Sequence, residues 1–332
     1  MIGLVIPLAL VLALTFAANK VEASGDQQLH KRFTWLLVLL NAPLIILGLV
    51  LFFLPAETIP FLQDSGLAAS DIDAMALIVI AVGLWGVLSC WIPFRRFLAR
   101  IMPLDADSPV HLTALIFAGC LVGNTAFALS QEFLQELNAT ELAVSVLEVV
   151  LQQAVFAMLA LSGAGLFVRR DLPGIYNRLG LLRPTLAQLI LGVAVIVLLI
   201  FIQGTIGAIW ALLDPEQAQQ LGNINEALLA GFDSIGEWFV LALASGIGEE
   251  LLFRGALQPV FGLPLTSLLF AVVHIQYGLT PITIVVFILG LILGIVRRYT
   301  NTTVAIFVHF GYNFSLGLLS MLALYLEQFV TP

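Results

Sequence analysis

The chain has 332 residues, of which 61% are hydrophobic and 10% are charged, and its formal net charge is −8. A soluble protein carries about 25% charged residues, so this composition excludes an ordinary water-soluble protein. The sequence has no basic patch beyond short loops, so nucleic acid is not expected as a partner. The apolar runs are long and continuous, as in transmembrane helices. The sequence therefore predicts an all-α, polytopic membrane bundle with membrane lipids as its surroundings.

About ten transmembrane helices are predicted, joined by short polar loops. The eighth is the shortest, at about 14 residues or ~21 Å, and is expected to be half-inserted or to thin the bilayer. The predicted spans are residues 2–19, 33–54, 75–93, 109–130, 143–168, 186–213, 235–257, 264–277, 280–296 and 302–326.

The charged loops predict the orientation of these spans. Twelve of the 13 Lys and Arg residues fall in loops on one side. The loops on the other side carry Asp and Glu residues but no Lys or Arg. The positive-inside rule then places both termini outside and the basic loops in the cytoplasm. The first span also resembles a signal peptide, but it has no basic n-region, so an uncleaved helix is favoured. We expect a multi-pass protein of a prokaryotic plasma membrane, with a site that opens toward the cytoplasm.

Two regions are expected to differ in role. Residues 1–140 form N-terminal transmembrane helices with few embedded ionisable groups and no assigned role. Residues 141–332 contain a set of polar side chains on otherwise apolar segments. An ionisable group in hydrocarbon costs roughly 2.5–3.5 kcal/mol on insertion scales and is rare unless it has a function. The set consists of Glu249, Glu250, Arg254, His274, His309 and Asn313.

Helical spacing assigns different surroundings to the two adjacent acids. Glu250 and Arg254 are four residues apart and share a helix face, so they are expected to pair. Glu249 points about 100° away, which leaves its carboxylate clear of the arginine. Two carboxylates in different environments can take two catalytic roles. The simpler interpretation is a buried Glu–Arg clamp, with a second acid in a water-filled pocket.

The histidines are predicted to lie at the same membrane depth as the acids. At 1.5 Å per residue, Glu249, His274 and His309 lie about 10, 16 and 12 Å from the cytoplasmic ends of their helices. A lone histidine in an apolar segment is more often hydrogen-bonded packing than a catalytic group, and a lone asparagine such as Asn313 is more often a link between helices. Together they predict one hydrated cavity, in which a carboxylate deprotonates water.

Three short motifs in this region resemble those of a known family. They read Glu249-Glu250-Leu-Leu-Phe-Arg254, Phe270-Ala-Val-Val-His274 and His309-Phe-Gly-Tyr-Asn313. The chain resembles the intramembrane proteases of the CAAX protease and bacteriocin-processing group (CPBP or Abi proteins), which are related to type II CAAX prenyl endopeptidases. The resemblance covers roughly residues 145–326.

The resemblance implies hydrolysis of peptide bonds in membrane-anchored or lipidated substrates, with prenylated CAAX-type proteins as one option. The candidate catalytic residues are Glu249, Glu250, His274, His309 and Asn313, with Arg254 as structural support. By similarity, Glu249 activates water with help from His274, while His309 and Asn313 stabilise the oxyanion. Glu250 and Arg254 are then structural partners.

Two questions stay open at this stage. Zinc is one alternative, because a carboxylate with two imidazoles (Glu249, His274 and His309) is the ligand set of many catalytic zinc sites. A mechanism without tightly held zinc is favoured, since the three ligands lie on separate helices. The other open question is activity itself. The alternatives to a protease are a catalytically inactive membrane scaffold and a proton-coupled transporter, although no inverted repeat is visible.

Overall fold

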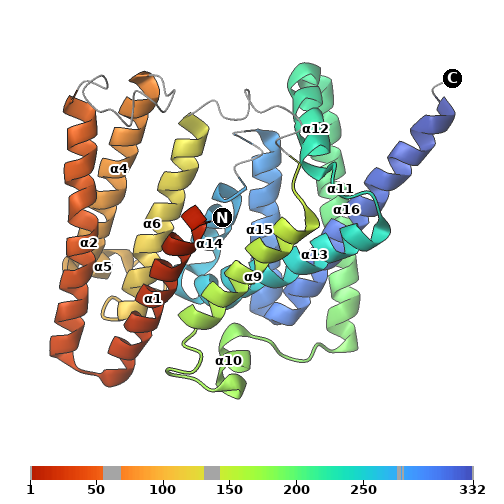
Figure 1. Cartoon of the computed structure of the whole chain (residues 1–332). Coiled ribbons are helices and arrows are strands. Elements are labelled where there is room, and N and C mark those ends of the chain that lie inside the picture. The colour runs from red at the N-terminus through yellow and green to blue at the C-terminus, as the bar shows by residue number, and fades with distance from the viewer. Residues whose placement is uncertain (1, 55–68, 131–142, 275–277, 279, 331–332) are drawn as a thin grey trace. The chain divides into compact units, whose positions relative to one another are not determined.

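The computed structural model describes residues 2–54, 69–130, 143–274, 278 and 280–330, and every regular element in these residues is a helix (Figure 1). The predicted all-α class is therefore confirmed. The chain divides into two compact units, and each is described by itself below. Unit 1 comprises Met1–Glu136 with Gly165–Arg169, and unit 2 comprises Leu137–Ala164 with Arg170–Pro332.

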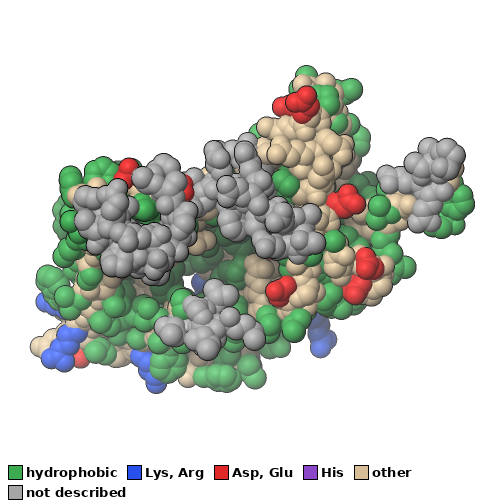
Figure 2. All heavy atoms as spheres, turned by 45° about the horizontal axis from the view of Figure 1, so that its top comes forward, with side chains coloured by type: hydrophobic (Ala, Val, Ile, Leu, Met, Phe, Trp, Pro, Cys, Tyr) green, Lys and Arg blue, Asp and Glu red, His purple; other side chains and the backbone are tan. Residues whose placement is uncertain are grey.

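Eight helices in the described residues are long and apolar enough to cross a membrane. Large hydrophobic side chains are exposed over much of the described surface, drawn green in Figure 2. Such a surface is compatible with a bilayer, because lipid tails are as apolar as the side chains that face them. The chain is an integral membrane protein, as predicted.

The count of eight differs from the predicted ten in two places. The first predicted span forms helix α1, Ile2–Ser24, which is not one of the eight. The predicted seventh and eighth spans lie on one helical run, Ile235–Val272. That run is interrupted at Gly262, whose φ of 76° and ψ of 174° are not helical. The interruption lies between the predicted spans 235–257 and 264–277, so the run has two arms.

Unit 1 is a bundle in which small residues allow close helix packing. A Cβ added at Gly48 of α2 would lie 2.7 Å from the carbonyl oxygen of Ala76 in α4. Arg169, in the segment that returns to this unit, donates to Asn19 at 2.7 Å and forms an ion pair with Glu22. The remaining elements of unit 1 are α2 (Gln27–Phe53), α4 (Ala69–Cys90), α5 (Ile92–Leu98) and α6 (Pro109–Ser130).

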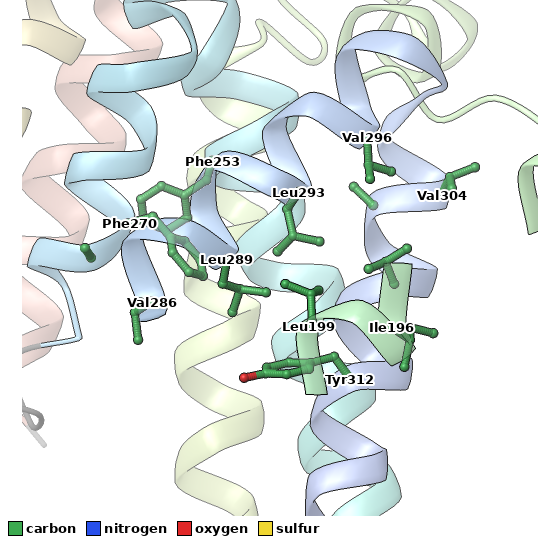
Figure 3. Close-up of a cluster of buried hydrophobic side chains, with 13 residues drawn as sticks. Ile196, Leu199, Phe253, Phe270, Val286, Leu289, Leu293, Val296, Val304 and Tyr312 are labelled. Carbon is green, nitrogen blue, oxygen red and sulfur yellow. The ribbon is translucent and has the colours of Figure 1, made fainter. Parts of the chain in front are cut away.

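Unit 2 is built around a buried hydrophobic cluster to which five elements contribute (Figure 3). Within it, Phe253 and Phe270 meet edge to face, with ring centroids 5.2 Å apart. The elements of unit 2 are α9 (Val146–Gly163), α10 (Leu172–Leu179), α11 (Leu186–Leu213), α12 (Pro215–Leu229), α13 (Ile235–Glu250), the π-helix η2 (Leu251–Leu257), α14 (Gln258–Val272), α15 (Pro281–Tyr299) and α16 (Thr302–Val330).

The π-helix η2 continues α13 without a break and begins directly after the two acids. Single turns of π-helix are rare in proteins, and those that occur often lie at functional sites. Here the turn is braced from outside, because Arg178 of α10 donates to the carbonyl oxygen of Gly255 at 2.8 Å. Helix α10 itself docks through Ile175 and Leu179, which are both buried. The turn that carries Arg254 is thus held at a fixed position.

We expect Gly262→Ala to lower the free energy of unfolding by about 1–3 kcal/mol, because the backbone conformation at Gly262 is one that only glycine adopts readily. The measurement is the midpoint of thermal unfolding in detergent. Gly204→Ala in α11 is the matched control, since a Cβ there meets nothing within 4 Å. Equal unfolding midpoints for the two variants would contradict the claim that the backbone at Gly262 requires glycine.

Candidate active site

The two acids lie in the last turn of α13, at a place where neighbouring helices approach very closely. A Cβ at Gly246 would lie 3.1 Å from the backbone nitrogen of Phe310 in α16, and one at Gly248 would lie 2.7 Å from the carbonyl oxygen of Gln153 in α9. Both glycines are therefore needed for packing, as small residues commonly are between membrane helices. This packing brings α9 and α16 alongside Glu249 and Glu250.

Glu250 lies between a guanidinium and an imidazole. Its Oε1 is 3.2 Å from Nη1 of Arg254 and 2.9 Å from Nδ1 of His309, and all three side chains are buried. The predicted i,i+4 pair with Arg254 is confirmed. The contact with His309 adds a second function, because a carboxylate on one ring nitrogen fixes the direction of the other.

Arg254 is held by more than its acid. Its Nη2 donates to the carbonyl oxygen of Gly290 at 3.3 Å, and its guanidinium carbon lies 4.3 Å from the ring centroid of Phe270. Cation–π contact with an aromatic face is favourable for a desolvated guanidinium. Buried charges persist in apolar surroundings only when they are paired and hydrogen-bonded. Arg254 therefore neutralises Glu250 and ties η2 to α14 and α15.

Glu249 has different neighbours from Glu250, as its position on the helix predicts. Its Oε1 accepts a hydrogen bond from Nε2 of Gln153 at 3.1 Å. Its Oε2 lies 3.8 Å from Nε2 of His274 and 4.0 Å from Nε2 of His309. This oxygen is buried and has no hydrogen-bond partner within the described residues. The two oxygens of Glu249 thus have distinct surroundings, with one fixed by an amide and the other facing two imidazoles.

Hydrogen bonding defines which nitrogen of each histidine faces Glu249. Nδ1 of His274 lies 2.7 Å from the carbonyl oxygen of Phe270. A carbonyl can only accept, so Nδ1 carries the proton, and Nε2 is the atom that offers a lone pair in the neutral ring. Nδ1 of His309 likewise donates to Glu250. His309 can then donate at Nε2 only as an imidazolium.

The structure brings together both acids, both histidines and Arg254: the acids end α13, Arg254 lies in η2, His309 lies in α16, and His274 lies two residues past the end of α14. Asn313 is the exception. It lies one turn after His309 on α16 and is half-buried, and within the described residues it makes no hydrogen bond to the acids or histidines. The catalytic roles of all five residues stay predictions.

Sequence reasoning missed Gln153, which contacts Glu249 directly. It lies on α9, more than 90 residues before the acids, and is buried. The available signal was weak: two adjacent glutamines, Gln152 and Gln153, interrupt an apolar span. Nothing in the sequence shows which helix face they occupy relative to Glu249, because that depends on how α9 packs against α13.

The predicted zinc ligands were Glu249, His274 and His309. The three lie near one another, yet no group of three or more His, Cys, Asp or Glu side chains in the described part of the chain has an arrangement that could hold a metal ion. His274 and His309 each use Nδ1 in a hydrogen bond, and only their Nε2 atoms face Glu249. The zinc site stays an untested prediction, and no chemical step below depends on it.

Residues 231–315 match the protein family described as type II CAAX prenyl endopeptidase Rce1-like. Every motif residue from Glu249 to Asn313 lies inside the matched segment, whereas Gln153 lies outside it. The resemblance noted from the three motifs is thereby confirmed. No curated protein and no solved structure matches the chain.

Proposed function

We propose that the chain is an intramembrane endopeptidase in which Glu249 and His274 activate water. The observation that carries the proposal is the pair of acceptors formed by Glu249 Oε2 and His274 Nε2, which are 3.8 Å apart, with Glu249 buried and His274 partly exposed. That separation is too long for a direct hydrogen bond and suits one bridging water. A water molecule can donate one hydrogen to each acceptor, which directs its lone pairs at a substrate carbonyl.

The proposed reaction is general-base hydrolysis of an amide. The water proton passes to Glu249 Oε2 as the water oxygen bonds to the carbonyl carbon. The carbonyl oxygen becomes an oxyanion, which His309 can stabilise by donating from Nε2 as an imidazolium. The tetrahedral intermediate then collapses: the C–N bond breaks, and the proton held by Glu249 moves to the departing amine, directly or through His274.

Charge balance favours His309 as the cation of this site. Glu249 and Glu250 bring two negative charges into a buried region, and Arg254 brings one positive charge. A protonated His309, hydrogen-bonded to Glu250 at 2.9 Å and facing Glu249 at 4.0 Å, makes the cluster neutral. Near-neutral clusters are far less costly in low dielectric than isolated ions. Asn313, one turn away, is proposed as a second oxyanion donor once substrate is bound.

The proposed substrate is a membrane-anchored or lipidated peptide, with prenylated CAAX-type proteins as the specific option that the family description suggests. We propose residues 141–332 as the catalytic core and leave the N-terminal helices without a role. The segregation of Lys and Arg into alternate loops supports a site that opens to the cytoplasm of a prokaryotic plasma membrane. The cleavage assay below separates this proposal from the transporter and scaffold alternatives.

The proposal is tested with the purified full chain in detergent or liposomes and a fluorogenic peptide carrying a C-terminal CAAX sequence, with and without a prenyl group. We expect cleavage by the wild-type chain. We expect His274→Ala to lower kcat by about 10²–10⁴-fold, because it removes one of the two acceptors for the water. His30→Ala is the matched control, since His30 begins α2 in unit 1.

Two further arms of the assay separate the alternatives. Wild-type protein that cleaves neither peptide, while a pH jump drives proton flux through its liposomes, would overturn the protease in favour of a transporter. A chelator that abolishes cleavage, with recovery on addition of Zn²⁺, would establish the predicted zinc. Preference for the prenylated peptide would identify the lipid as part of the substrate.

A further inference from the structure

We propose that Gln153 is a positioning residue that fixes Glu249 for water activation; this inference rests on the proposed function. Gln153 comes from α9, outside the segment that matches the family. Its Nε2 donates to Glu249 Oε1 at 3.1 Å. The amide group donates only from nitrogen, so a carboxylate partner fixes which way the side-chain amide points.

The hydrogen bond leaves only one oxygen of Glu249 available to water. A carboxylate on a flexible side chain can rotate and exchange its two oxygens. With Oε1 held by Gln153, Oε2 is directed at Nε2 of His274 and Nε2 of His309, at 3.8 and 4.0 Å. Preorganised groups of this kind lower the barrier because no reorientation is needed during reaction. Gln153 would therefore act through Glu249 without touching the substrate.

The surroundings of Gln153 argue against a role as simple packing. Its Oε1 is buried and has no hydrogen-bond partner within the described residues. A buried amide with an unsatisfied oxygen is unfavourable, and an apolar side chain of the same shape would cost less. The sequence thus retains glutamine at a position where shape alone favours methionine or leucine. The property that distinguishes glutamine there is its donor, and that donor contacts Glu249.

Gly248 keeps the amide in place. A Cβ at Gly248 would lie 2.5 Å from Oε1 of Gln153 and 2.7 Å from its carbonyl oxygen. Contacts that short force a shift in α9 or in the side chain of Gln153. Gly248 lies directly before Glu249 in the chain. Its lack of a side chain therefore allows α9 to approach α13 and brings the amide of Gln153 close to the carboxylate of Glu249. Gly248→Ala displaces the donor without removing it.

The kinetic test compares Gln153→Met with Gln152→Met in the peptide cleavage assay. Methionine keeps the approximate length of glutamine and has no donor. We expect Gln153→Met to lower kcat by about 10- to 100-fold, the loss that follows from removing one hydrogen bond to a charged group. KM should change by less than about twofold, because the substrate does not touch Gln153. Gln152 is exposed, so Gln152→Met should leave both constants unchanged.

A second measurement is independent of activity. Thermal unfolding in detergent is compared for wild type, Gln153→Met, Glu249→Met and the double variant. If the two side chains are hydrogen-bonded, the double variant should lose less in unfolding midpoint than the two single losses added together. Should Gln153→Met fail to fold, Gln153→Leu, which also lacks the donor, provides the kinetic test, with the same expected loss in kcat.

The outcomes separate this inference from the proposed function. Wild-type kcat in Gln153→Met overturns the positioning role and leaves the protease intact, and so does strict additivity of the two unfolding losses. A wild-type chain that cleaves no peptide, together with coupled unfolding losses, overturns the proposed function and retains the pairing. If kcat falls only in proportion to the amount of folded protein, Gln153 is a packing residue and the positioning role is overturned.

Discussion

Glu249→Gln is expected to lower kcat for peptide cleavage by about 10²–10⁴-fold while the protein still folds. Glutamine has nearly the shape of glutamate, but it cannot accept the proton that water must lose. Its amide oxygen can still accept from Nε2 of Gln153, as Oε1 does at 3.1 Å in the wild type, and its NH2 then takes the place of the acceptor Oε2. The measurement is kcat under saturating peptide, with the unfolding midpoint recorded on the same sample.

Glu237→Gln supplies the matched control for this change. Glu237 begins the same helix, α13, where it forms a capping box with Ser234 on the outer surface. Glutamine is accepted in that position of a capping box, so activity and stability should both stay at the wild-type level. Full activity in Glu249→Gln, with Glu237→Gln also active, would remove Glu249 from the mechanism.

Glu250→Ala is expected to destabilise the fold as well as abolish cleavage. The change leaves the guanidinium of Arg254 buried without its carboxylate and removes the hydrogen bond that orients His309. Removing one partner of a buried ion pair costs about 3–5 kcal/mol. The yield of folded, monodisperse protein and the unfolding midpoint in detergent should therefore both fall.

A compensated variant separates stability from chemistry at this position. Replacing both partners, in Glu250→Leu with Arg254→Met, removes the two charges together, and such apolar replacements are often neutral for stability. We expect the double variant to recover the folded yield and to remain inactive, because His309 has lost the acceptor for Nδ1. Recovery of activity in the double variant would show that orientation of His309 by Glu250 is not required.

Contacts within one helix were predictable from the sequence, because the period of the helix fixes them. The pairing of Glu250 with Arg254, and the separate environment of Glu249, follow from spacings of four and one residues. Close approach between helices is only partly predictable: at Gly290 of α15, a Cβ would lie 3.2 Å from Ser267 of α14. Glycine in an apolar helix predicts such an approach without identifying its partner.

Contacts between helices needed the coordinates. The hydrogen bond from His309 to Glu250, and that from Gln153 to Glu249, depend on the rotation and depth of α16 and α9 relative to α13. The π-helix η2 was also outside the reach of the sequence, since its residues have no composition that distinguishes it from an α-helix. Asn313 shows the opposite case: its helix face was predictable, but a shared face did not bring it into hydrogen-bond contact with the cluster.

The ion pairs of unit 2 also constrain how the chain enters the membrane during synthesis. The ribosome releases Glu249, Glu250 and Arg254 well before His309, which lies about 60 residues further along and supplies the imidazole that contacts Glu250. Until the last helix is inserted, the nascent chain holds an acidic helix end whose imidazole partner does not yet exist. Under the proposed mechanism, a chain that stalls before its final helix lacks His309 and carries an incomplete site.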